Sequence, residues 1–158
     1  MGEVTTGQAV HGTAAEVRRL SPSEVEAHLL ARDATLVDIR ESEELDEHGW
    51  IAGSVHVPRD LLESRADPAS PLHRPELDPQ RLTIVYCGAG DRSALAIGTL
   101  ESLGYLDVAD LDGGIVAWKQ ADAPVAGLAP WHRLHHDRRW RANAAAQRTP
   151  NHDTREQI

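Results

Sequence analysis

The chain has a single cysteine, Cys87, among its 158 residues. One cysteine excludes an internal disulfide and a cysteine-based metal cluster, and it fits a reducing compartment. Phenylalanine is absent, so four tryptophans and two tyrosines must supply the large aromatic side chains of the core. No apolar run approaches the ~20 residues that a membrane-spanning helix needs, and residues 1–12 lack the basic and apolar regions of a signal peptide. We therefore expect a cytoplasmic protein that does not enter a membrane.

Basic residues are outnumbered by acidic ones, and the formal net charge is −9. This balance argues against nucleic acid or an acidic membrane as a partner. The exception is residues 130–158, where six arginines face three acidic residues and four of the nine histidines lie. We expect residues 128–158 to form a basic, His-rich extension, helical or disordered, that folds back onto the acidic body or mediates self-association into a homo-oligomer. A metal site in it is the weaker alternative, since no carboxylate or cysteine completes the histidine pattern.

Short apolar runs alternate with helical patterns along residues 14–127, which we expect to form one domain after a flexible N-terminus at residues 1–13. This alternation predicts an α/β fold with an open, mostly parallel five-stranded sheet and helices on both faces. Residues 41–48 are acidic and predict a short, solvated helix. Four prolines between residues 67 and 80 indicate a long irregular loop. Strands are expected at residues 16–20, 35–39, 54–57, 82–86 and 107–111, and the main helices at 22–31, 93–103 and 115–119.

The most informative stretch is residues 82–93, in which a β-branched run ends at Cys87 and a helix begins at Ser93. Gly88 and Gly90 let the loop bend until several N–H groups point at one spot. These donors, the positive end of the helix and the charge of Arg92 favour an anion there, and hence a nucleophilic thiolate on Cys87. The alternative interpretation is that Cys87 is a small buried hydrophobic residue.

The sequence Cys-Gly-Ala-Gly-Asp-Arg-Ser at residues 87–93 resembles the active-site loop of the rhodanese family of sulfurtransferases. Residues 36–41 with 49–58 are similar to the family's first signature, and residues 111–118 to its second. Together the resemblance covers about residues 17–125, in the order that the family has. It implies that Cys87 and Arg92 are catalytic. It further implies that the substrate is bound by the remaining residues of the loop, which are Gly88, Ala89, Gly90, Asp91 and Ser93.

Other residues are expected to support or line this site. Asp38 and Arg40 follow a predicted strand, and we interpret them as a structural ion pair; the resemblance likewise implies that Asp38 supports the active-site end of the sheet. Trp118 is interpreted as a core residue, because large aromatics contribute heavily to small cores. Arg65 precedes the long loop, and the resemblance implies that an arginine from this region can line the pocket and attract an anionic donor. The alternative is that Arg65 is a solvated surface residue with no role in the pocket.

The spacing of cysteine and arginine separates two kinds of chemistry. Cys87 and Arg92 are separated by four residues, whereas the cysteine-dependent phosphatases that share the rhodanese fold have five. The shorter loop leaves room for a single extra sulfur atom, and the charge of Asp91 disfavours a bound phosphate. We therefore favour sulfur transfer. The alternatives are a non-catalytic sulfur carrier, a sulfide-sensing or binding module and, more remotely, a phosphatase or arsenate reductase.

The expected reaction is a two-step covalent exchange. The Cys87 thiolate takes the outer sulfur of a small anionic donor such as thiosulfate, and cyanide or a thiol then removes it. A persulfide of a small thiol is also a candidate donor, and 3-mercaptopyruvate ranks last. Because the chain has no second cysteine, the acceptor must come from outside, for example as the cysteine of a partner protein. We expect neither a metal nor a cofactor beyond the covalent Cys87 persulfide.

Overall fold

The computed structural model describes residues 16–127. The predictions for residues 1–13 and 128–158, including the histidine-based metal alternative and self-association, concern positions outside the described residues. No helix within the described part is long and apolar enough to cross a membrane.

Five strands form one sheet in the order β1-β5-β4-β2-β3, and every neighbouring pair is parallel. The predicted sheet is thus confirmed, and it is parallel throughout. β2 and β5 are buried along their whole length because both faces are covered, as is usual in parallel sheets. The strands are β1 (Arg19–Leu20), β2 (Ala34–Asp38), β3 (Val55–His56), β4 (Leu82–Tyr86) and β5 (Val108–Leu111).

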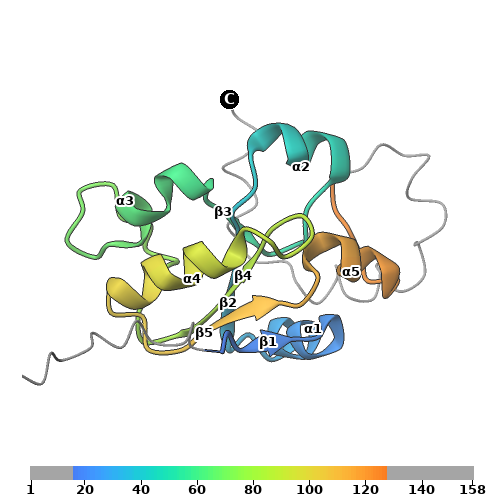
Figure 1. Ribbon diagram of the computed structural model, residues 1–158, viewed down its shortest axis with the longest axis horizontal. Helices are drawn as coiled ribbons and strands as arrows, with labels where there is room; N and C mark the ends of the chain where they lie inside the picture. Colours follow the sequence, from blue (N-terminus) through green and yellow to red (C-terminus); the bar gives the residue numbers. More distant parts are fainter. Residues whose placement is uncertain (1–15, 128–158) are drawn as a thin grey trace, which may run out of the picture.

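The helices lie on the two faces of this sheet (Figure 1). Alternate residues of β4 divide the core between them: Val85 packs with α3 and α4, whereas Ile84 and Tyr86 pack with α1 and α5. Ser21 begins α1 with the reciprocal capping box that its sequence predicts. The helices are α1 (Pro22–Ala31), α2 (Ser42–His48), α3 (Leu62–Ala66), α4 (Ser93–Ser102) and α5 (Gly114–Gln120), with a 3-10 turn, η1 (Arg59–Leu61), before α3.

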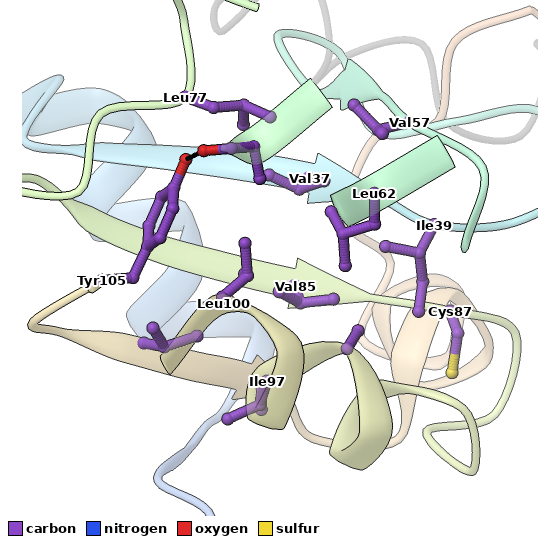
Figure 2. Packing of buried hydrophobic residues seen from close by; sticks show 13 residues of the cluster. Val37, Ile39, Val57, Leu62, Leu77, Val85, Cys87, Ile97, Leu100 and Tyr105 are labelled. Carbon is purple, nitrogen blue, oxygen red and sulfur yellow. Dashed lines mark hydrogen bonds between the residues drawn. The ribbon is translucent and has the colours of Figure 1, made fainter. Parts of the chain in front are cut away.

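The register brings the carboxyl ends of the central strands to one edge. Asp38 pairs with Tyr86 across β2 and β4, and Cys87 follows Tyr86 directly. Figure 2 shows Cys87 at the end of this strand, beyond Val85 and near Ile39. In parallel sheets this is the edge at which ligands bind, so the fold places the cysteine loop where chemistry is expected.

Candidate active site

The sulfur of Cys87 is held at the turn between β4 and α4. The backbone N–H of Gly90 donates to Sγ at 3.1 Å, and the Ser93 hydroxyl donates to it at 3.3 Å. Both donors favour a negative sulfur, as the sequence predicts for this loop. Sγ also lies 3.8 Å from Asp91 Oδ1, a carboxylate oxygen that can accept a hydrogen bond from the thiol.

Cys87 is also fully buried, and it belongs to the apolar cluster between the sheet and α4. The two interpretations of this cysteine therefore each describe part of its surroundings: apolar side chains on one side, hydrogen-bond donors on the other. Ala89 and Asp91, in the loop around the sulfur, are exposed. Since Cys87 is 0% exposed, its sulfur is closed to solvent in this conformation.

Arg92 ends the loop but its guanidinium faces a carboxylate rather than the sulfur. Nη1 and Nη2 bond the two oxygens of Glu44, in α2, at 2.8 and 2.6 Å. This bidentate pair raises the pKa of Arg92 and, chiefly through the same hydrogen bonds, lowers the pKa of Glu44 to about 2. The pair ties the cysteine loop to α2 and offsets the positive charge that the sequence places beside Cys87.

Glu44→Gln is expected to loosen this connection at neutral pH and to have no effect in acid. Because the folded pKa of Glu44 is about 2, below its ordinary value of 4.5, the pair stabilises the fold above pH 4.5. That stability is lost as the pH falls through about 2. The side chains of Arg92 and Glu44 are 27% and 32% exposed, so solvent weakens the pair and we expect a loss of about 1 kcal/mol at pH 7.

Urea denaturation at several pH values measures this difference. Glu43→Gln, one residue away in the same helix, is the matched control, because the structure shows no ion pair for Glu43 among the described residues. An equal effect of both substitutions, or an effect of Glu44→Gln that persists in acid, would contradict the pairing.

The amino end of α5 fixes the loop from the other side. Ile115 N–H donates to Cys87 O at 3.0 Å, and Val116 N–H donates to Gly88 O at 3.1 Å. This approach requires Gly114, whose φ is +60° and whose missing Cβ would lie 2.5 Å from Gly88 O. The second signature, residues 111–118, therefore contacts the cysteine loop through its backbone.

Asp38 and Arg40 lie beneath the same edge as a buried ion pair. Arg40 Nε and Nη2 contact the two oxygens of Asp38 at 3.0 and 2.8 Å, and Nη2 also donates to Gly49 O at 2.7 Å. The Tyr86 hydroxyl donates to Asp38 Oδ2 at 2.6 Å, so the network links β2 to the residue before Cys87. Burial is the main cause that raises the pKa of Tyr86 and keeps its hydroxyl protonated.

Two further predicted residues form hydrogen bonds with other parts of the chain. Trp118 is buried with α5, and its indole N–H donates to Pro124 O at 2.8 Å. Arg65, in α3, donates from Nη1 to Leu72 O at 3.4 Å, in the long proline-containing loop. Within residues 16–127, no hydrogen bond or ion pair joins Arg65 to the cysteine loop, and the role of Arg65 as a pocket residue stays a prediction.

Sequence reasoning missed Glu44, Asp110 and the contact role of Gly114. Glu44 belongs to an acidic stretch that we interpreted as a solvated face, and its partner is 48 residues away. Asp110 left a signal: it is an acidic residue inside a short apolar strand, and it is 3% exposed. Aspartate is rarely found fully buried, so an acidic residue at this strand position is a signal that the sequence does contain.

Asp91→Asn is expected to speed the reaction of Cys87 with anionic reagents. A carboxylate 3.8 Å from Sγ repels a second anion, and at this separation unit charges interact by about 1 kcal/mol in water and about 4 kcal/mol near a protein surface. Removing the charge should therefore raise the ratio of the rates with anionic and cationic methanethiosulfonates about tenfold, corresponding to ~1.4 kcal/mol.

A neutral methanethiosulfonate measures any accompanying change in thiolate content, and the single cysteine ensures that only Cys87 reacts. A charge ratio that stays the same in Asp91→Asn would show that this carboxylate does not control anion access.

The parallel sheet and the cysteine at the end of its central strand define an α/β domain with a candidate nucleophilic thiol. The profile of the rhodanese-like domain family matches residues 21–121, and the chain belongs to that family, whose relatives include sulfurtransferases. The predicted family and fold are therefore confirmed.

Individual relatives agree with this assignment. A sulfurtransferase of Allochromatium vinosum is 33% identical over 93 residues, which are 59% of this chain and 78% of that protein. The thiosulfate sulfurtransferase GlpE of Ectopseudomonas mendocina is 32% identical over 107 residues, covering 66% and 86% of the two chains. A solved structure from Rhodopseudomonas palustris, described as a protein of unknown function and possible tyrosine phosphatase, has a TM-score of 0.65 at 35% identity, covering 69% of this chain and 84% of that one.

Proposed function

We propose that this protein transfers a sulfane sulfur from an external donor such as thiosulfate, through a persulfide on Cys87, to cyanide or a thiol. The observation that carries the proposal is the convergence of the Gly90 N–H and the Ser93 hydroxyl on Sγ. Both can stabilise the Cys87 thiolate, which attacks in the first step and is the leaving group in the second. The sulfurtransferase relatives support the same chemistry.

In the first step the Cys87 thiolate attacks the outer sulfur of thiosulfate. A sulfur–sulfur bond forms at Sγ, the original sulfur–sulfur bond breaks, and sulfite leaves with its electron pair. In the second step cyanide attacks the outer sulfur of the persulfide, thiocyanate forms, and the thiolate returns with the bonding pair. A thiol acceptor would leave as a persulfide, and a partner protein's cysteine could act in this way.

The test is thiosulfate-dependent thiocyanate formation by the wild type and by Cys87→Ser. We expect the wild type to turn over and Cys87→Ser to have no activity above the uncatalysed reaction, because serine cannot form the persulfide. Mass spectrometry of the wild type should show a species one sulfur atom heavier that cyanide removes. Equal rates in both proteins would remove Cys87 from the mechanism.

The same measurements separate the alternatives. A sulfur carrier would show the heavier species without steady turnover of any small donor. A phosphatase, the second candidate, is favoured by the similarity to the Rhodopseudomonas palustris protein and would hydrolyse a chromogenic phosphate ester in a Cys87-dependent way. We expect no such hydrolysis, because the loop from Cys87 to Arg92 is one residue shorter than in those phosphatases and carries Asp91.

A further inference from the structure

Glu44 is an acidic residue of α2 that the proposed mechanism does not use, although its side chain lies beside the cysteine loop. A Cβ added to Gly88, the residue after Cys87, would lie 3.0 Å from Arg92 Nη2 and 4.0 Å from Glu44 Oε1. The ion pair of Arg92 and Glu44 therefore sits against the backbone next to the reacting cysteine. Because charges act over about 8 Å at physiological salt, a donor molecule at this loop is within range of both groups.

The carboxylate of Glu44 is held from two directions. Its Oε2 accepts a hydrogen bond from the Glu41 N–H at 2.9 Å, at the start of its own helix. Arg92 Nη1 donates to Oε2 at 2.8 Å and Nη2 donates to Oε1 at 2.6 Å, which makes the ion pair bidentate. Bidentate pairs of this kind have a well-defined geometry. With both Nη atoms engaged, the guanidinium of Arg92 is directed at α2 rather than at the sulfur.

The Glu44 carboxylate also changes the balance of charge around the sulfur. In the cysteine loop itself, Arg92 is the only basic residue and Asp91 the only acidic one, and Asp91 Oδ1 lies 3.8 Å from Sγ. With Glu44, two carboxylates face one guanidinium. Arg40 also acts on Glu44 and helps to lower its pKa, but it is itself paired with Asp38 at 2.8 Å. An anionic donor at this loop therefore meets a net negative charge.

We propose that Glu44 is a positioning residue that selects the sulfur donor by charge, because it holds the guanidinium of Arg92 and adds a second carboxylate beside the cysteine loop. The inference rests on the proposed function and narrows its donor: donors with less negative charge are favoured over the thiosulfate dianion. The transfer step is the same for each donor. The Cys87 thiolate attacks the outer sulfur, a new sulfur–sulfur bond forms, and the leaving group departs with the electron pair of the bond that breaks.

Three donors that react through the same kind of bond differ in charge. Thiosulfate is a dianion and releases sulfite. The methanethiosulfonate ion is a monoanion and releases methanesulfinate, and 2-aminoethanethiosulfonate is a zwitterion without net charge that releases the corresponding sulfinate. Because the Coulomb energy is proportional to the charge of the donor, the effect of a charge near the sulfur must grow along this series. A displaced sulfur, in contrast, would slow the reaction with all three donors alike.

The experiment measures kcat/KM for each donor from the formation of thiocyanate. In a two-step exchange this constant depends on the step with the donor alone, so the acceptor does not affect it. With Glu44→Gln we expect the ratio of kcat/KM for thiosulfate to that for the zwitterion to rise about tenfold, and the ratio for the methanethiosulfonate ion to the zwitterion about threefold. Ratios that stay within about twofold of the wild type, or that do not follow donor charge, overturn the proposal.

Two further variants separate charge from structure. Glu44→Asp keeps the negative charge on a shorter side chain, so its donor ratios should stay within about twofold of the wild type even where all three rates fall. Glu43→Gln removes the same charge from an exposed position one residue away in α2, where solvent screens it, and should also leave the ratios within about twofold. A shift in either variant as large as that in Glu44→Gln overturns the proposal.

Should Glu44→Gln fail to fold, the wild type still decides. Added sodium chloride screens the charges around the sulfur, so kcat/KM for thiosulfate should rise with salt relative to kcat/KM for the zwitterion. A ratio that falls with salt would show that thiosulfate meets a net positive charge, which contradicts the proposal.

Failure of the proposed function can be distinguished from failure of this inference. If no donor yields thiocyanate, the proposed function is overturned. The role of Glu44 is then measured by the reaction of Cys87 with the anionic and cationic methanethiosulfonate esters, the reagents described above for Asp91→Asn. Because these esters also differ by two charges, the ratio of the anionic to the cationic rate should rise about tenfold in Glu44→Gln. An unchanged ratio overturns the role of Glu44.

Discussion

Arg40→Met is expected to lower the free energy of unfolding by about 3–5 kcal/mol, as is usual when one partner of a buried ion pair is removed. Arg40 is 1% exposed, although arginine is among the residues most rarely found inside. It neutralises Asp38 and donates to Gly49 O. Methionine fills much of the same space but leaves the Asp38 carboxylate buried with the Tyr86 hydroxyl and without its counter-charge.

Urea denaturation of both proteins measures this loss. Arg59→Met is the matched control, because Arg59 is exposed in η1 and the structure shows no ion pair for its side chain among residues 16–127. We expect the control to change stability by less than about 0.5 kcal/mol. A loss in Arg40→Met as small as the control's would show that Asp38 does not need this partner.

Gly114→Ala is expected to reduce sulfur transfer about hundredfold, the usual order for a displacement of about 1 Å at a reacting group. The new Cβ would lie 2.5 Å from Gly88 O and 2.6 Å from Cys87 O, and both obstacles are backbone atoms. The contact can be relieved only by moving the cysteine loop or α5. Either movement disturbs the hydrogen bonds from α5 to the loop and with them the placement of Sγ.

Gly104→Ala is the control that separates the effect of this collision from the loss of stability caused by a side chain in a left-handed backbone conformation. Gly104 also has a positive φ, +91°, but nothing lies within 4 Å of its added Cβ. Both substitutions should lower stability by roughly 1–2 kcal/mol through the left-handed conformation, whereas only Gly114→Ala should slow thiocyanate formation and alter the alkylation rate of Cys87. Equal activity in the two variants would contradict the role given to the contact.

Patterns that depend on near neighbours in the sequence predicted the fold well. Alternating apolar runs and helical stretches predicted the five-stranded sheet, and the run that ends at Cys87 placed the cysteine at the strand end where the structure has it. The capping box at Ser21 was confirmed in full. β3 is shorter than predicted, with only Val55 and His56 paired to β2. Such predictions succeed because strand, turn and cap preferences are properties of adjacent residues.

Contacts between distant residues were harder to predict. Arg92 carries the charge that the loop pattern suggests, but nothing in the sequence indicates that Glu44 offsets it. The sequence places Arg65 just before a long loop but does not indicate that its Nη1 donates to Leu72 O in that loop. Ser93 is of a residue type favoured at helix N-caps, but it is the first residue of α4, after the N-cap Arg92, and its hydroxyl donates to Cys87 Sγ. In each case the partner of the side chain depends on how the helices pack on the sheet. Residue spacing along the chain does not indicate that packing.

The sequence by itself determined that a lone thiol would follow a buried parallel strand and precede a helix, because the strand, the turn and the start of the helix are each predicted by adjacent residues. Only the tertiary structure decided what surrounds that thiol: full burial, a carboxylate oxygen at 3.8 Å and the hydroxyl of Ser93 at 3.3 Å. The physical reason is that the charge of a sulfur depends on every group within a few ångströms. Those groups come from segments that meet only when the sheet register and the packing of α4 are set.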